Sequence, residues 1–67
     1  MKSNMTPEEL KDFLRDKRMS PEVLAEILGV TTSAVMHWLN GIRYIPETTA
    51  RLLRLFKKRP DFMREFG

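Results

Sequence analysis

The chain has 67 residues, a formal net charge of +3 and no cysteine. Its length allows one domain, covering residues 1–67, with a small core, and the lack of cysteine excludes disulfides and thiolate sites. The first residues lack the apolar core of a signal peptide, and no apolar run approaches membrane-spanning length. We therefore expect a cytoplasmic protein that makes no membrane contact.

Charge is distributed unevenly along the chain. Residues 1–30 contain five Lys and Arg against six Asp and Glu, which gives −1, whereas residues 31–67 contain seven against three, which gives +4. No acidic residue occurs from Ile27 to Pro46. Because a solvated helical surface normally mixes both signs, this acid-free span predicts a face without charges that would repel phosphate.

A first helix is predicted from residue 7 to about Lys17. Thr6 is a suitable N-cap, and Glu9 stands three residues after it, as in a capping box. Lys17 and Arg18 end the helix, where the helix dipole favours cations, although contact with phosphate explains them equally well. Three apolar residues at helical spacing face inward: Leu10, Phe13 and Leu14.

Residues 20–41 predict two short helices joined by a tight turn. Ser20 caps the first of them, and Gly29 ends it with a positive φ, which glycine adopts without strain. Val30 then follows as an apolar plug in the turn. The inward stripe of this helix consists of Leu24, Ile27 and Leu28.

The second helix of this pair begins at Thr31, whose hydroxyl can cap it, and is stopped by Asn40 and Gly41. Its inward face carries Ala34, Val35 and Trp38. Its outer face carries Thr32, Ser33, Met36, His37 and Asn40.

A fourth helix is predicted from Glu47 to about Arg59. Pro60 breaks it, and Asp61 can cap a short fifth helical turn. The apolar residues at this end of the chain exceed what one face of a small core can hold, so the helix is either buried on two sides or presents a surface to a partner. We expect a homodimer whose interface contains Leu52, Leu55, Phe56, Phe62, Met63 and Phe66.

The residues give little support to catalysis. With one histidine and no cysteine, a zinc site would need several carboxylates beside His37. A pair formed by Ser33 and His37 has no third member nearby and no glycine-rich loop to bind an oxyanion or a phosphate. We therefore expect no enzyme activity, no metal ion and no cofactor.

Four constrained positions at fixed offsets distinguish residues 20–43 from a simple helical hairpin, although a hairpin could share two of them. They are a small residue where the helices meet, a glycine at the bend, an aliphatic residue in the angle and a tryptophan, and a polar end follows them: Ala25, Gly29, Val35, Trp38 and then Asn40-Gly41-x-Arg43. In these features the segment resembles the helix-turn-helix of the Cro and phage-repressor family. The resemblance extends over roughly residues 6–59.

The resemblance implies that the second helix of the pair enters the major groove of double-stranded DNA. Its outer face would then read bases through Thr32, Ser33, Met36 and His37. Contacts with the DNA backbone would come from Thr31, Asn40, Arg43 and Tyr44, with Lys17 and Arg18 as further candidates. Without the resemblance, His37 is an ordinary surface side chain, and Arg43 and Tyr44 simply cover a small core.

The sequence departs from the family pattern at two positions. Pro21 stands where many of these repressors have a glutamine that clamps the backbone, so anchoring would depend more on helix N–H groups and on Arg43 or Tyr44. Leu39 replaces a frequently acidic residue and adds apolar surface near the DNA-facing end. The reading helix also lacks Gln and Arg, so specificity would depend on thymine methyl groups, single hydrogen bonds, water or DNA shape.

Together these observations predict a compact all-α bundle of four to five helices, like the DNA-binding domains of Cro and phage repressors. The expected function is a sequence-specific transcriptional regulator. It would act as a homodimeric repressor on an inverted-repeat operator, in a phage, a mobile element or a small operon, with no small-molecule effector. The alternative is an antitoxin-like module that uses the same fold to bind a protein partner.

Overall fold

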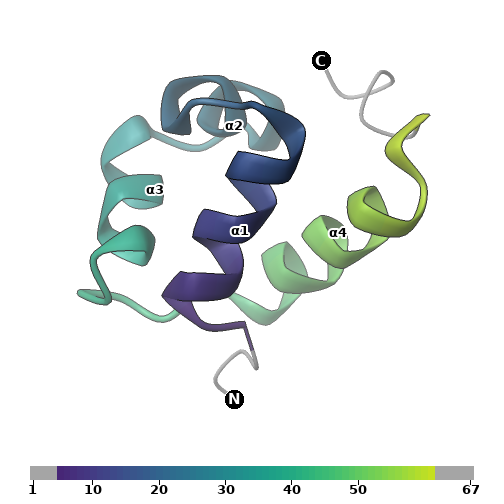
Figure 1. Cartoon of the computed structure of the whole chain (residues 1–67). Helices are drawn as coiled ribbons and strands as arrows, with labels where there is room; N and C mark the ends of the chain where they lie inside the picture. The colour runs from purple at the N-terminus through teal and green to yellow at the C-terminus, as the bar shows by residue number, and fades with distance from the viewer. Residues whose placement is uncertain (1–4, 62–67) are drawn as a thin grey trace.

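The computed structural model describes residues 5–61, and this part of the chain is entirely helical, with no strand (Figure 1). The all-α fold predicted from the sequence is confirmed. Pro60 and Asp61 have 3₁₀ geometry, and the rest of the predicted fifth turn lies outside the described residues. No described helix is long and apolar enough to cross a membrane. The four helices are α1 (Pro7–Lys17), α2 (Pro21–Leu28), α3 (Thr32–Leu39) and α4 (Glu47–Lys58).

Hydroxyl side chains begin the first three helices, as predicted. In each, the backbone N–H of the third helical residue donates to the cap hydroxyl, at 3.1 Å for Thr6, 3.3 Å for Ser20 and 3.1 Å for Thr31. Glu9 completes a capping box, because its carboxylate accepts from the N–H of Thr6 at 3.1 Å. Helix α4 follows Pro46 and has no side-chain cap. These caps pair N–H groups that the first turn of a helix cannot pair internally.

Left-handed residues end two of the helices. Gly29 ends α2 with φ of 73°, as predicted, and its N–H donates to carbonyls in the last turn. Arg18 ends α1 with φ of 52° and ψ of 49°, a conformation that the sequence analysis did not anticipate for a residue with a Cβ. After α3, the chain turns at Gly41, whose φ is 72°.

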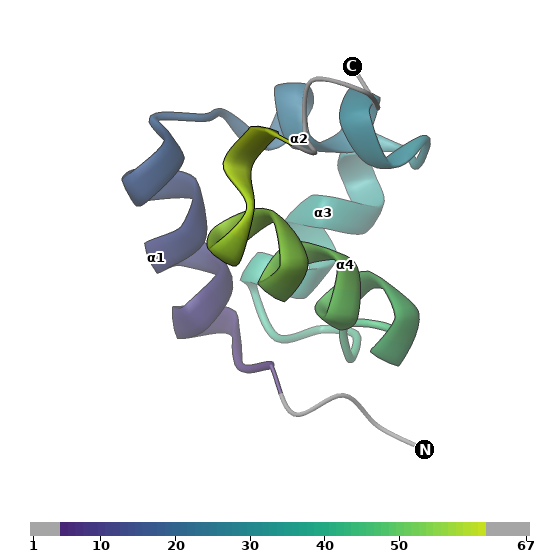
Figure 2. The same cartoon turned by 90° about the vertical axis from the view of Figure 1, so that its right-hand side faces the viewer.

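The core lies between the helices, and α3 packs against both α1 and α2 (Figures 1 and 2). Two predictions at the edge of this core were wrong. Val30 is exposed and does not plug the turn, whereas Leu39 is buried and adds no apolar surface near α3's end. Ile27 and Leu28 are only partly buried, because α2 turns chiefly Leu24 and Ala25 inward. The buried residues are Met5, Leu10, Phe13, Leu14, Leu24, Ala25, Val35, Trp38, Leu39, Ile45, Ala50, Leu53 and Phe56.

Helix α4 buries one face only. Phe56 is fully buried in the core of its own chain, so its assignment to a dimer interface was wrong. Leu52 is partly buried against the same core, and Leu55 is 40% exposed. The other predicted interface residues, Phe62, Met63 and Phe66, lie outside the described residues.

Candidate nucleic-acid interface

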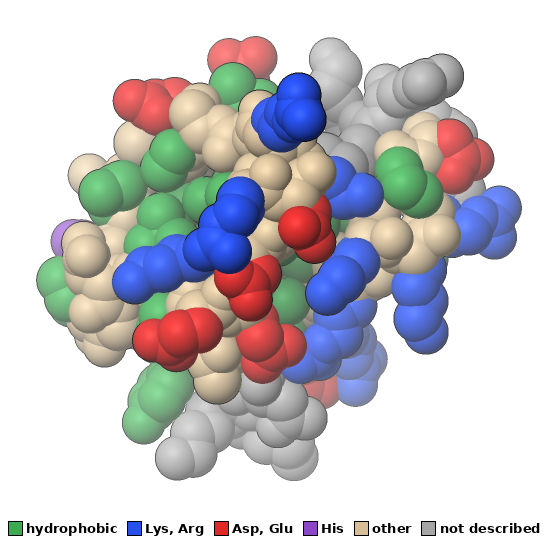
Figure 3. Space-filling view, in the orientation of Figure 1, with side chains coloured by type: hydrophobic (Ala, Val, Ile, Leu, Met, Phe, Trp, Pro, Cys, Tyr) green, Lys and Arg blue, Asp and Glu red, His purple; other side chains and the backbone are tan. Residues whose placement is uncertain are grey.

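The outer face of α3 is exposed at three of its side chains. Thr32 and Ser33 are exposed in its first turn, and Met36 is 41% exposed one turn later. In Figure 3 this side of the molecule, at the left edge, shows polar and apolar side chains and the histidine. The acidic side chains lie over other elements. The helix therefore presents hydroxyls, a thioether and an imidazole on one accessible face.

Thr31 holds the start of this face in place. Its backbone is extended, with φ of −78° and ψ of 153°, and its side-chain oxygen accepts from the N–H of Ala34 at 3.1 Å. The hydroxyl can still donate its own proton to an external acceptor, because a hydroxyl both donates and accepts. The cap role predicted for Thr31 is confirmed, and a phosphate contact remains a prediction.

His37 is less accessible than its neighbours on this face. It is partly buried, and its Nδ1 atom is buried without a hydrogen-bond partner among the described residues. A buried Nδ1 cannot reach a base edge. Only Nε2 remains available for base contact in this side-chain position.

The loop after α3 is folded back onto that helix. The N–H groups of Ile42 and Arg43 both lie near the carbonyl oxygen of His37, donating at 2.9 Å and 3.4 Å. Ile45 is buried in the core and fixes the far end of the loop. Arg43 is exposed between these two attachments, beside Tyr44, which is 72% exposed. This geometry places a cation and a phenol directly after α3.

Ile42 was missed by the sequence analysis. It is 66% exposed, among the most exposed large apolar side chains of the described residues. Residues 40–44 are all exposed and Ile45 is buried, so no spacing in the sequence marks Ile42 as a surface residue. An exposed isoleucine beside α3 can contact a thymine methyl group or an apolar partner surface.

The structure does not gather all of the predicted backbone contacts in one place. Asn40 is exposed at the C-terminal end of α3, close to Arg43 in the chain. The end of α1, with Lys17 and Arg18, lies at the opposite end of the domain from the loop after α3 (Figures 1 and 2). Lys17 is also partly buried. The geometry therefore favours a helix-end role for Lys17 and Arg18.

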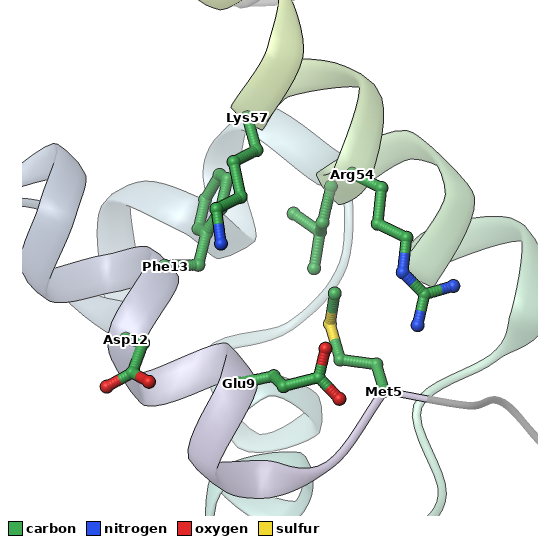
Figure 4. A pocket seen from close by; sticks show the side chains of 7 residues that line it. Met5, Glu9, Asp12, Phe13, Arg54 and Lys57 are labelled. Atoms are coloured by element: carbon green, nitrogen blue, oxygen red, sulfur yellow. The ribbon is translucent and has the colours of Figure 1, made fainter.

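A small pocket lies away from α3, between α1 and α4 (Figure 4). Its volume is about 170 Å³, and its opposing rims carry carboxylates from α1 and cations from α4. Within residues 5–61, no group of three or more metal-ligating side chains occurs. The lining residues are Met5, Glu9, Asp12, Phe13, Leu53, Arg54 and Lys57.

Comparison with known proteins gives a partial relationship. No family model matches the chain. The chain is similar to homeobox-containing protein 1 of Mus musculus and of Homo sapiens, with 40% identity over 37 residues in each case. The match covers 55% of this chain and 9% of the length of those relatives. The similarity to Cro and phage repressors thus remains a prediction from residue pattern.

Proposed function

We propose that this chain is a sequence-specific DNA-binding domain that inserts α3 into the major groove. The observation that carries the proposal is the outer face of α3, which is exposed, hydrogen-bonding and part of a twenty-residue span without a carboxylate. A major groove admits an α-helix, and the N-terminal residues of that helix meet the base edges. Absence of acidic side chains matters there because phosphates line both sides of the groove.

The named relatives support this proposal from a second direction. Homeodomains are helical domains that read the major groove with one helix of a helix-turn-helix variant. The similarity covers 37 residues of this chain and 9% of the relatives' length, so it supports a DNA-binding role but does not identify the matched segment as a homeodomain.

Each exposed group on α3 has a distinct part in the proposed recognition. The hydroxyls of Thr32 and Ser33 would make single hydrogen bonds to base edges, and Met36 would contact a thymine methyl group. His37 would use Nε2, since Nδ1 is buried. Arg43 would fix the register by binding the backbone. The site contains no bidentate reader, so water and DNA shape would supply much of the specificity.

Repression and dimerisation are the finer parts of the proposal. A bound domain can repress by occupying a promoter, and helix-turn-helix dimers bind half-sites about 34 Å apart in an inverted repeat. Of the six residues predicted for the dimer interface, Phe56 is unavailable and three lie outside the described residues. The dimer therefore remains a prediction. The mass of the protein–DNA complex in solution would decide it.

Binding to a protein is the second candidate function, and the exposed apolar residues favour it. Met36, Ile42 and Tyr44 lie along α3 and the following loop, where Arg43 is the only cation between residues 31 and 46. An antitoxin-like partner surface would use these side chains as apolar anchors. Such binding would be much less sensitive to salt than binding to DNA.

The two functions are separated by titrating labelled random-sequence duplex DNA with the protein at 50 and 200 mM salt. If the domain neutralises about two phosphates, affinity falls roughly tenfold over this range. An Arg43→Gln variant should show weaker binding and a shallower salt dependence, whereas Lys11→Gln, an exposed substitution on α1, serves as the control. Absence of DNA binding at low salt, or binding that does not change with salt, contradicts the proposal.

A further inference from the structure

A cationic surface with an apolar centre lies on α4, apart from the proposed DNA face. It consists of Arg51, Arg54, Leu55 and Lys58, which together line a shallow hollow of about 240 Å³. Leu55 is 40% exposed at its centre. We call these four residues the basic patch of α4. Blue side chains gather on the right of Figure 3, over this helix.

The charge of the basic patch is only partly balanced. Arg51 donates to the Glu47 carboxylate at 2.7 Å, one helical turn earlier. No carboxylate of the described residues forms a salt bridge with Arg54 or Lys58. The patch and Glu47 together therefore carry three cations against one anion, and two of those cations have no acidic partner among the described residues.

The patch cannot serve the DNA proposed to lie on α3. In Figure 1, α3 lies on the left of the molecule and α4 on the right, and in Figure 2, which is seen from that right-hand side, α4 is drawn in front of α3. A duplex held against the far side of α3 would thus leave the basic patch in solvent.

A second copy of this chain is a poor occupant. A two-fold interface places the same surface of both subunits together, so Arg54 and Lys58 of each copy would meet like charges. A second DNA duplex would satisfy the cations through its phosphates but would leave Leu55 without an apolar contact. An acidic protein segment with a large apolar side chain satisfies both parts of the patch.

We propose that the basic patch of α4 binds an acidic peptide segment that places one large apolar side chain against Leu55. The aliphatic stems of the surrounding arginines and lysine extend the apolar floor of the hollow, and their charged ends meet carboxylates on either side. The bound side chain fills the hollow, while the ion pairs set its orientation. A DNA-bound domain could bind such a segment at the same time.

The probe is a synthetic peptide of aspartates and glutamates with one central phenylalanine, together with the same peptide carrying alanine at the centre. Binding to the full chain is followed by shifts of the backbone amide signals in NMR. We expect the phenylalanine peptide to shift signals of α4 and to bind roughly tenfold more tightly than the alanine peptide, a ratio equivalent to one buried apolar side chain. Leu55→Ala should abolish this difference.

Charge is tested by a matched pair on the same helix. Lys58→Gln removes a cation from the patch, whereas Lys57→Gln removes an equal charge beside the pocket shown in Figure 4. Lys58→Gln should weaken peptide binding several-fold more than Lys57→Gln. The proposal is overturned if the two variants bind alike, if the two peptides bind alike, or if neither peptide binds. It is also overturned if duplex DNA displaces the peptide and Lys58→Gln weakens DNA binding by the same factor as peptide binding.

Discussion

The side chains on α3 and its loop divide into those that would read sequence and those that would anchor the helix. Nδ1 of His37 is buried, which leaves Nε2 as the ring nitrogen that could read a base, and Arg43 is exposed on a loop fixed at both ends. A side chain that reads sequence contributes to affinity at one base pair, whereas a side chain that binds the DNA backbone contributes to affinity for any sequence. This difference makes single substitutions informative.

His37→Ala tests the reading role. We expect a cost on the order of 1–3 kcal/mol at the preferred site and little change on unrelated DNA, with relaxed preference at one base pair. Thr32→Ala and Ser33→Ala should act in the same way with smaller effects. The measurement is the affinity of each variant for a preferred duplex and for its scrambled form. Equal losses of affinity for both duplexes would show that His37 does not read sequence.

Arg43→Ala tests the anchoring role. Because a phosphate contact carries no sequence information, affinity for every duplex should fall by a similar factor, and the slope of log affinity against log salt should decrease by about one. Titrations at several salt concentrations measure both effects. A loss confined to the preferred duplex would instead make Arg43 a base reader.

The Thr31 cap predicts that a substitution at this position changes the stability of the free protein. Thr31→Ala removes the acceptor for the N–H of Ala34 and should lower the free energy of unfolding by about 1 kcal/mol. Thr32→Ala is the control, because Thr32 is the next residue but does not cap the helix. This variant should change the free energy of unfolding little. Urea denaturation measures both. Equal stabilities of the two variants would show that the cap hydrogen bond contributes nothing.

At the scale of the helix, α1 and α2 each end at a residue with positive φ. These two positions predict opposite effects of glycine and alanine substitutions on stability. Arg18→Gly relieves a φ of 52° and should raise the free energy of unfolding by about 1 kcal/mol. Gly29→Ala should lower it by a similar amount, because φ is 73° and no atom lies within 4 Å of the added Cβ, so the cost is conformational. Thermal unfolding compares them with wild type. A destabilising Arg18→Gly would reveal contacts of the guanidinium that outweigh the strain.

The same Arg18→Gly variant separates a helix-end role from a DNA role. Arg18 follows the end of α1, which lies at the opposite end of the domain from the loop after α3 (Figures 1 and 2), so we expect its removal to leave DNA affinity unchanged. A fall in affinity as large as that of Arg43→Ala would show that the duplex extends across the whole domain.

Local signals made the helices predictable from the sequence. Thr6, Ser20 and Thr31 acted as caps within three residues of the groups they bond, and Gly29 ended α2 through its own backbone freedom. Such effects need no knowledge of the rest of the fold. Arg18 was not predictable in the same way, because a residue with a Cβ takes a left-handed conformation only when surrounding contacts stabilise it.

The side chains that depend on packing between helices were harder to predict. Leu39 was assigned to the surface from its departure from the family pattern, and Phe56 to a dimer interface because its end of the chain has more apolar residues than one face of a small core can hold. Both are buried. The number of residues that a helix turns inward depends on the neighbours it packs against, and α3 packs mainly against α1 and α2. Likewise, burial of Nδ1 in His37 follows from the tertiary surroundings of α3 and has no signature in spacing.

For the molecule as a whole, the oligomeric state is the open prediction. With Phe56 buried and Leu55 surrounded by cations, the described part of α4 offers little apolar surface for self-association. If the homodimer forms, sedimentation should show two chains per inverted-repeat duplex at micromolar concentration. One chain per duplex at high micromolar concentration would refute it.

The central claim is that α3 reads DNA sequence, and selection of bound fragments from a random duplex pool tests it most directly. Wild-type protein should enrich one discrete motif, and a symmetric motif would also identify an inverted-repeat operator. A variant combining Ser33→Ala and His37→Ala, which leaves Arg43 and the Thr31 cap intact, should still retain DNA at low salt but enrich no motif. Failure of the wild-type protein to enrich any motif, or enrichment of the same motif by the variant, would contradict the account.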